Sequence, residues 1–154
     1  MKISTWKKKF SKFLVGILVL GLILSCINTK SVQAASQNST YYYCTILNKS
    51  KGGKTGNYWI PGTRQVNYTN TSITFYGSFS KSKKLPVQFS KNNFIKYGKK
   101  TFKLTSKTKY YWTEEYRKIP AKKTDALKCC KRLNGLQVVL QIKGSNVVSL
   151  TFYS

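Results

Sequence analysis

Apolar and polar residues alternate most regularly at the C-terminal end of the chain, over residues 136–154. This period of two predicts two strands, 136–143 and 146–153, each with one apolar face. Gly144-Ser145 between them predicts a two-residue hairpin loop of type II′, because that turn requires glycine at its first position. A hairpin with one apolar face is not stable alone, so other elements must cover it. The residues expected to face the core are Leu136, Val138, Leu140, Ile142, Val148, Leu150 and Phe152.

A similar alternation predicts a half-buried strand over residues 72–81, with Phe75 and Phe79 on its inner face. Gly77 within this strand predicts a bulge or a bend. Aromatic and β-branched residues predict further strands, and Gly98-Lys99 is expected to form a tight turn between the last two of them. These strands are expected over residues 41–47, 65–68, 87–97 and 101–112, and a polar, glycine-containing loop is expected over 48–57.

One segment, residues 121–133, is predicted to form a helix. Pro120 suits the first turn, and Asn134-Gly135 is a stop signal after two basic residues. The apolar stripe on this helix is narrow, so we expect it to lie as a lid on a sheet. Its stripe residues are Ala126, Cys130 and Leu133, with Cys130 directed into the core and Cys129 at its rim.

The first 34 residues have the order of a secretory signal peptide. A lysine-rich start and an apolar run precede Val32-Gln33-Ala34, so cleavage is expected between Ala34 and Ala35. Two alternatives stay open. Leu24-Ser25-Cys26 resembles the lipobox of bacterial lipoproteins, where Cys26 is lipidated, and the apolar run can also remain as an uncleaved anchor. All three routes place residues 35–154 outside the cytoplasmic membrane, in the extracellular space or at the cell surface.

The charge balance is extreme, with 28 Lys and Arg residues against 3 Asp and Glu residues and a formal net charge of +25. Such a surface attracts polyanions. For an exported chain the expected partners are anionic cell-wall polymers (teichoic acids) or anionic lipid headgroups, and nucleic acid is a weaker alternative. A lysine-rich surface that is merely solvated and has no specific ligand also remains open.

Basic and aromatic residues are interleaved in the second half of the chain. Alternate residues on the strands of a barrel would form a cationic face with stacking rings, as in proteins that bind single-stranded nucleic acid. The same face suits a polymer of sugar and phosphate, although such rings can instead fill the core. Three rings are expected on the surface, at positions 59, 110 and 112. The candidate binding residues are Trp59, Lys99, Lys100, Lys103, Lys107, Lys109, Tyr110 and Trp112.

Three cysteines follow the expected cleavage site, and two interpretations of them stay open. A disulfide can join Cys44 to Cys129, or to Cys130, since an exported compartment permits it. Alternatively, all three are small buried apolar residues. The sequence holds 0 His residues, so we expect neither a metal site nor a thiol nucleophile with its usual base. With only three carboxylates available, we expect no enzymatic activity and no cofactor.

The order of the elements resembles a known fold. Strands at 72–81, 87–97 and 101–112, then a helix, then strands at 136–143 and 146–153, have the order of an OB-fold, a mainly β five-stranded barrel with a helix between the third and fourth strands. The segment from Thr101 to Tyr110 and the closing hairpin are similar to small exported OB-like domains of Gram-positive bacteria. This resemblance covers about residues 72–154, and it implies a fold without implying an activity.

These observations predict three segments: a signal peptide over 1–34, a leader with N-terminal strands over 35–71, and an OB-like barrel over 72–154. The N-terminal strands are expected to add a hairpin over one end of the barrel. The expected function is that of a monomeric, non-enzymatic surface protein that associates with anionic wall polymer or membrane surface. Two alternatives are a secreted cationic antimicrobial protein of the bacteriocin kind and an extracellular nucleic-acid-binding module.

Overall fold

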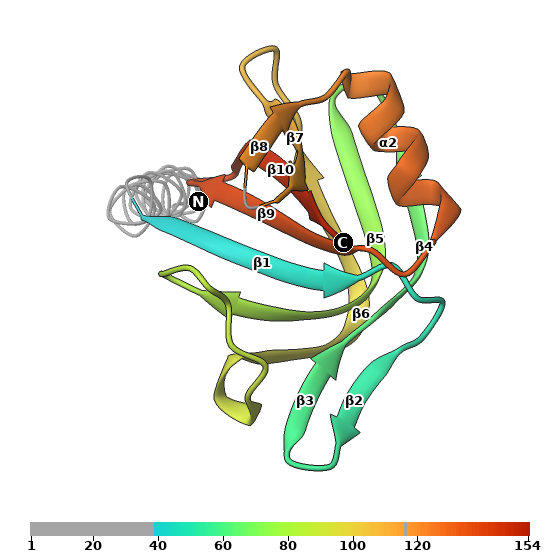
Figure 1. Cartoon of the computed structure of the whole chain (residues 1–154), viewed down its shortest axis with the longest axis vertical. Helices are drawn as coiled ribbons and strands as arrows, with labels where there is room; N and C mark the ends of the chain where they lie inside the picture. Colours follow the sequence, from blue (N-terminus) through green and yellow to red (C-terminus); the bar gives the residue numbers. More distant parts are fainter. Residues whose placement is uncertain (1–38, 116) are drawn as a thin grey trace, which may run out of the picture. The chain divides into compact units, whose positions relative to one another are not determined.

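A computed structural model describes residues 39–115 and 117–154 (Figure 1). The expected signal peptide, its cleavage site at Ala34 and Ala35 and the lipidation candidate Cys26 lie outside the described residues. Within the described part, no helix is both long and apolar enough to cross a membrane. The elements are β1 (Thr40–Ile46), β2 (Gly52–Thr55), β3 (Tyr58–Pro61), β4 (Thr63–Tyr68), β5 (Ser72–Ser82), the 3₁₀ turn η2 (Lys91–Asn93), β6 (Phe94–Lys103), β7 (Lys109–Glu114), β8 (Arg117–Pro120), α2 (Lys123–Arg132), β9 (Gln137–Lys143) and β10 (Asn146–Tyr153).

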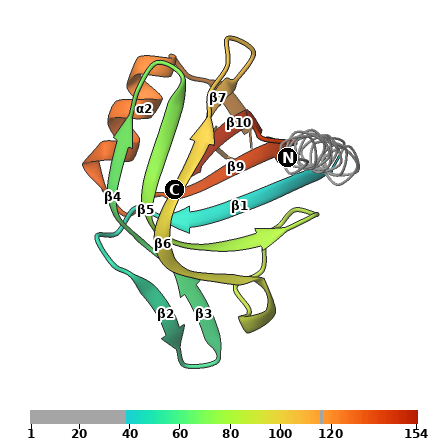
Figure 2. The ribbon, with the colours of Figure 1, turned by 180° about the vertical axis from the view of Figure 1, so that it is seen from behind.

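The described residues form a mainly β fold with one short α-helix and a mixed sheet. Five strands close a ring of hydrogen-bonded neighbours, in the order β5, β1, β9, β10, β6 and back to β5. The ring is not a regular barrel, because β10 and β6 run parallel and pair only at Asn146 and Lys103. Strand β7 continues the parallel pairing along β10, and β4 adds to the outer edge of β5. Figure 2 shows β6 curving across the back of the ring.

Both strands of the C-terminal hairpin are confirmed, and Gly144 has a φ of 60°, as the first residue of the expected turn requires. The prediction of which β10 residues face the core is partly wrong. Val148 was expected in the core but is 37% exposed, whereas Val147 is buried. The register shifts between Val147 and Ser149, and this bulge turns Val147 inward before Leu150 resumes the alternation.

Strand β5 and its irregularity at Gly77 are also confirmed, since the pairing to β6 shifts between Gly77 and Phe79. The expected strands over 87–97 and 101–112 are partly wrong, because Phe94–Lys103 forms the single strand β6 and β7 begins only at Lys109. Gly98 makes no turn but lies inside β6, directly opposite Gly77. The chain turns instead after β6, where the Thr105 amide donates to the Thr108 hydroxyl at 2.9 Å.

Strand β1 belongs to the ring, although it lies in the segment that we expected to be separate from the barrel. It pairs with β5 on one side and with β9 on the other. The expected loop over 48–57 is partly wrong, because Gly52–Thr55 pairs with Tyr58–Pro61 as the two-stranded hairpin β2–β3. This hairpin projects below the ring in Figure 1.

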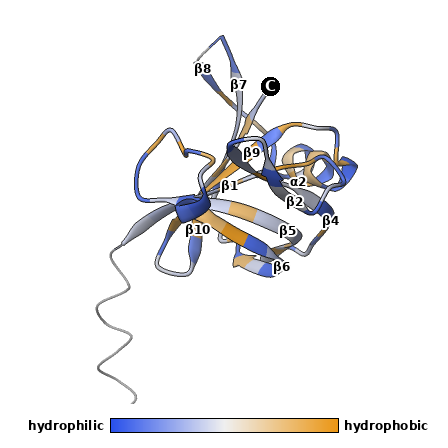
Figure 3. Ribbon diagram, turned by 90° about the horizontal axis from the view of Figure 1, so that it is seen from below, coloured by the Kyte–Doolittle hydropathy of each residue, from blue (hydrophilic) through white to orange (hydrophobic). Residues whose placement is uncertain are grey.

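Helix α2 is two residues shorter at its start than expected, because Pro120 ends strand β8. Its buried residues are Ala126, Leu127, Cys129 and Cys130, and they pack in the same cluster as the inner faces of the ring strands. Hydrophobic and hydrophilic positions alternate along those strands (Figure 3). The largest fully buried side chains include Phe75, Phe79 and Phe152, so aromatic rings fill much of the core.

Candidate functional site

The inner face of β1 carries two tyrosines, Tyr41 and Tyr43, at the end of the ring where the chain enters it. They lie two residues apart and therefore on the same side of the strand. The Tyr43 ring packs edge-on against Phe79 at 6.1 Å and Phe102 at 5.3 Å between ring centroids. Tyr41 pairs with the core residue Ile142. Both tyrosines are half-buried, so each offers one part of its ring to the core and another to the surface.

Three lysine ammonium groups lie over these two rings. Lys81 Nζ is 3.8 Å from the centroid of the Tyr41 ring and 5.4 Å from that of Tyr43. Lys83 Nζ is 5.9 Å from the Tyr41 ring, and Lys100 Nζ is 5.5 Å from the Tyr43 ring. The pairing of the strands places them there, because Lys81 is the cross-strand partner of Tyr43. The residues of this lysine–tyrosine cluster are Tyr41, Tyr43, Lys81, Lys83 and Lys100.

Within the cluster the rings take the place of acidic partners. A cation over an aromatic ring is stabilised by about 0.5–1 kcal/mol at an exposed site. The three carboxylates of the chain lie elsewhere. Glu114 ends β7 beside the last residues of β10, whereas the cluster lies beside the first residues of β10, and Asp125 is on α2. Glu115 lies in the turn after β7. The described part of the chain therefore leaves the three ammonium charges without a carboxylate counterion.

At two other places a lysine ammonium group also lies over an aromatic ring instead of beside a carboxylate. Lys51 Nζ lies 5.6 Å from the Tyr97 ring, and Lys118 Nζ lies 5.8 Å from the Tyr111 ring. A lysine held in this way keeps its ammonium group at the surface while its methylene stem covers apolar area. The cluster differs from these single contacts because three charges lie over two neighbouring rings of one strand.

The cationic face expected from the sequence does not form as one surface. Lys99 and Lys103 are exposed on the outer face of β6, while Lys100 points to the opposite face and joins the cluster. Lys109 is exposed on β7 and Lys107 in the loop before it. Of the cluster residues, Lys100 alone was among the candidate binding residues expected from the sequence.

The expectation that Tyr110 lies on the surface is wrong, because its side chain is only 6% exposed. Burial also raises the pKa of its phenol. Trp112 is half-buried and stacks on Phe152, with 4.4 Å between ring centroids and 28° between planes. Both residues face inward because β7 lies parallel to β10 and its alternate residues point into the core. Trp59 is half-buried on β3, 5.1 Å from the ring of Phe94.

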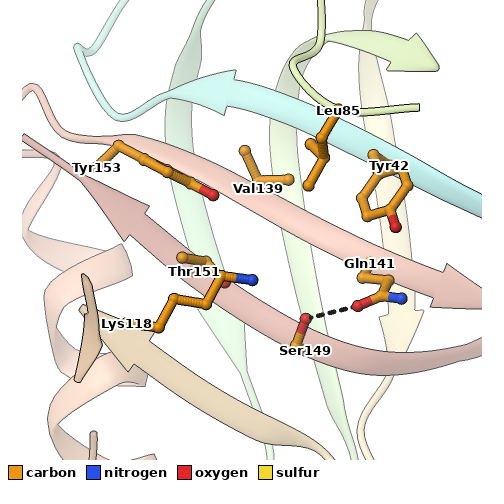
Figure 4. Close-up of a pocket in the computed structure, with 8 residues that line it drawn as sticks. All are labelled: Tyr42, Leu85, Lys118, Val139, Gln141, Ser149, Thr151 and Tyr153. Atoms are coloured by element: carbon orange, nitrogen blue, oxygen red, sulfur yellow. Dashed lines mark hydrogen bonds between the residues drawn. The ribbon is translucent and has the colours of Figure 1, made fainter. Parts of the chain in front are cut away.

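A small pocket lies outside the ring, across β1, β9 and β10 (Figure 4). Its volume is about 50 Å³, and its floor includes a hydrogen bond from Ser149 Oγ to Gln141 Oε1 of 3.1 Å. Pockets that bind organic ligands measure roughly 300–1,000 Å³. The space therefore holds a few water molecules, and the pocket is too small for a sugar ring or a nucleotide.

The three described cysteines are free thiols, so the expected disulfide between Cys44 and Cys129 or Cys130 is not present. All three are buried, which agrees with the alternative that they act as small apolar residues. Burial raises the pKa of the Cys44 thiol to about 12, although a hydrogen bond from Gln137 Nε2 at 3.1 Å opposes this change. These thiols are protonated at neutral pH and are poor nucleophiles.

Among the described residues, no group of three or more Cys, Asp and Glu side chains is arranged to hold a metal ion. Comparison of the chain with protein families, with curated proteins and with solved structures finds no match.

Proposed function

We propose that this chain is a small, exported, strongly basic and non-enzymatic protein that binds an anionic polymer of the cell wall through its lysine–tyrosine cluster. The observation that carries the proposal is the convergence of Lys81, Lys83 and Lys100 over two rings, without a carboxylate among them. A phosphate of the polymer would supply the missing counterion. Ammonium groups bind phosphate as point charges with several donors, so the site needs no single ligand geometry.

After the expected signal cleavage the chain keeps 22 Lys and Arg residues against 3 Asp and Glu residues, and this net charge of +19 supports the same proposal at longer range. A one-sided charge of this kind raises the local concentration of a polyanion and speeds its association. The cluster would then hold the polymer after this attraction has brought it to the surface. Because screening weakens with burial, half-buried Lys81 and Lys100 should hold an anion more firmly than fully exposed lysines do.

We also propose that the ring is an OB-like barrel. Strands β1, β5 and β6 follow one another around it, α2 follows in the chain after β7 and β8, and the hairpin β9–β10 closes the ring onto β1 and β6. This is the element order of an OB-fold, whose barrels bind oligonucleotides and oligosaccharides. The order supports a binding module. The resemblance to small exported OB-like domains of Gram-positive bacteria covers residues 72–154, so it includes four of the five ring strands and leaves out β1.

The proposal is tested by retention of the purified chain on isolated walls, with and without teichoic acid. A variant carrying Lys81→Gln, Lys83→Gln and Lys100→Gln should lose most of its retention on walls that carry the polymer. The matched control, Lys99→Gln, Lys103→Gln and Lys107→Gln, removes the same charge from exposed positions and should lose much less. Equal losses in the two variants would show that charge acts collectively and that the cluster is not a site.

The same experiment separates the competing functions. Anionic vesicles and a single-stranded oligonucleotide replace the walls in parallel measurements. Tighter binding to vesicles together with leakage of their contents would support an antimicrobial protein, because surface lysines each contribute about 1 kcal/mol of attraction to anionic lipid. Tighter binding to the oligonucleotide would support a nucleic-acid-binding module. Either result would overturn the assignment to wall polymer.

A further inference from the structure

A second concave surface lies away from the lysine–tyrosine cluster, between the hairpin β2–β3 and the segment 87–91. It is an open groove of about 530 Å³. Its apolar lining includes Tyr58, Trp59 and Phe89, and its polar lining includes Asn57, Gln88 and Lys91. Figure 1 shows the two segments lying side by side below the ring. The volume is within the range of about 300–1,000 Å³ found for ligand pockets.

Both walls of the groove are held by contacts that involve the backbone. The Trp59 amide donates to the Phe89 carbonyl at 3.3 Å and ties the hairpin to the facing segment. The Trp59 ring packs on Phe94 at 5.1 Å, which sets its orientation. Asn93 Nδ2 donates to the Gln88 carbonyl at 3.4 Å. The groove therefore exists before a ligand enters, which reduces the entropy lost on binding.

The lining combines rings with free hydrogen-bonding groups. Tyr58 is 65% exposed, which is unusual for a large ring without a partner. The side-chain amides of Asn57 and Gln88 make no hydrogen bond to another described residue, so their donors and acceptors are open to a ligand. Lys91 adds a positive charge at the same surface, and none of the three carboxylates of the chain lines the groove.

We infer that this groove holds a sugar ring of the same anionic polymer, an inference that rests on the proposed function. A pyranose has two faces of C–H groups, which pack on aromatic rings, and a rim of hydroxyls, which need amide and hydroxyl partners. The rings and the side-chain amides of the lining match these two requirements. Lys91 would contact a phosphate attached to the sugar.

The concave shape favours a sugar over a membrane. If the hairpin were inserted into a lipid interface, the polar side-chain amides of Asn57 and Gln88 would reach the headgroup boundary together with the rings. Trp59 is half-buried at the wall of the groove and does not project from the tip of the hairpin. Rings that anchor a protein in a membrane interface project from its surface. The arrangement is therefore that of an open groove with Trp59 in its wall, although Tyr58 beside it is exposed.

The test measures binding of the full chain to trisaccharides of glucose, galactose, mannose and N-acetylglucosamine, and separately to inorganic polyphosphate. At least one trisaccharide should bind. Tyr58→Ala, which changes an exposed side chain and should leave the fold intact, should weaken that binding roughly tenfold, as loss of an aromatic anchor does. Trp59→Leu should weaken it at least as much. The control Tyr68→Ala changes an exposed ring on β4 outside the groove and should have no effect.

Polyphosphate carries charge without sugar, so it distinguishes this inference from the proposed function. The Tyr58→Ala variant should bind polyphosphate as tightly as the unmodified chain, whereas the cluster variant with three Lys→Gln changes should bind it more weakly. If polyphosphate binds through the cluster but no trisaccharide binds, the groove assignment is overturned and the proposed function stands. If a trisaccharide binds and polyphosphate does not, the groove is a sugar site, but the proposed function and the assignment of the sugar to the anionic polymer are both overturned. Trisaccharide binding that Tyr58→Ala and Trp59→Leu leave unchanged also overturns the groove.

Discussion

Tyr43 connects the core to the lysine–tyrosine cluster, so its replacement tests both parts of the structure. Its ring makes edge contacts with Phe79 and Phe102 and lies under the ammonium groups of Lys81 and Lys100. Tyr43→Leu keeps an apolar side chain of moderate size but removes all four interactions with the ring. Tyr43→Phe keeps the ring and removes only the hydroxyl, and it is the matched control.

The expected cost follows from these contacts. Each edge-on aromatic pair contributes about 0.5–1.5 kcal/mol beyond burial, and each cation over a ring contributes about 0.5–1 kcal/mol. Four such terms share one side chain and are not fully additive, so Tyr43→Leu should lower the free energy of unfolding by about 2–4 kcal/mol. Tyr43→Phe should change it by less than about 0.5 kcal/mol.

Urea unfolding of the two variants and of the unmodified chain gives these values, provided that the slope with denaturant is the same in all three. The midpoint of Tyr43→Leu should fall by about 1–2 M urea, since a small domain loses roughly 1–3 kcal/mol per molar urea. If the Leu and Phe variants unfold at the same midpoint, the ring makes no specific contribution, and the geometry described for the cluster is wrong.

Three further predictions concern the thiols and the β5–β6 pair. Burial raises the Cys44 pKa from 9.0 to about 12. The contribution of this thiol to the free energy of unfolding is therefore fully present below pH 9, and it falls by on the order of 4 kcal/mol as the pH rises to 12. Between pH 8 and 11, the free energy of unfolding of Cys44→Ala should therefore fall by less than that of the unmodified chain. Equal falls of the two, measured by urea unfolding, would contradict this. Alkylation with mass spectrometry should find Cys44, Cys129 and Cys130 unreactive in the folded chain and all three reactive after unfolding, whereas a persistent disulfide would refute the free thiols. In Gly77→Ala the new Cβ would lie 2.6 Å from the Gly62 carbonyl oxygen, and this should cost about 1–3 kcal/mol of thermal stability. Gly98→Ala has open space and is the neutral control, so equal effects would contradict the close approach of Gly77 to the Gly62 carbonyl.

Local patterns in the sequence were sufficient to predict the C-terminal hairpin, strand β5 and helix α2. Each of these has a regular hydrophobic period and a clear boundary signal. The same reasoning was wrong at Gly98, because a glycine inside a long curved strand and a glycine at a turn look alike in sequence. The pairing of Gly98 with Gly77 decides between them, and that pairing is a tertiary property.

The inward positions of β7 and β10 depend on tertiary structure in the same way. Val148 continues the period of two, but the bulge after Val147 displaces it to the surface. Tyr110 lies in a run of lysines and aromatic residues, and only its place beside β10 buries it. A pattern of alternate residues defines two faces of a strand without saying which face the core will cover.

The lysine–tyrosine cluster could be predicted only in part. Its tyrosines alternate on β1 and two of its lysines alternate at the end of β5, and these two signals were present in the sequence. About 40 residues separate them, and the register of β1 on β5 brings them together. Lys100 reaches the same position from β6. A site assembled from three strands in this way requires the pairing of all three, which single-sequence patterns do not supply.

The most direct test of the account is the salt dependence of polyphosphate binding. The logarithm of the binding constant falls linearly with the logarithm of salt concentration, and each phosphate contact on a flexible single-stranded polyanion contributes about 0.7 to the slope. Removing the ammonium groups of Lys81, Lys83 and Lys100 should therefore reduce the slope by about 2. The control with Lys99→Gln, Lys103→Gln and Lys107→Gln should reduce it by less than about 1. Equal slopes for the two variants would contradict the claim that the lysine–tyrosine cluster is the anion-binding site.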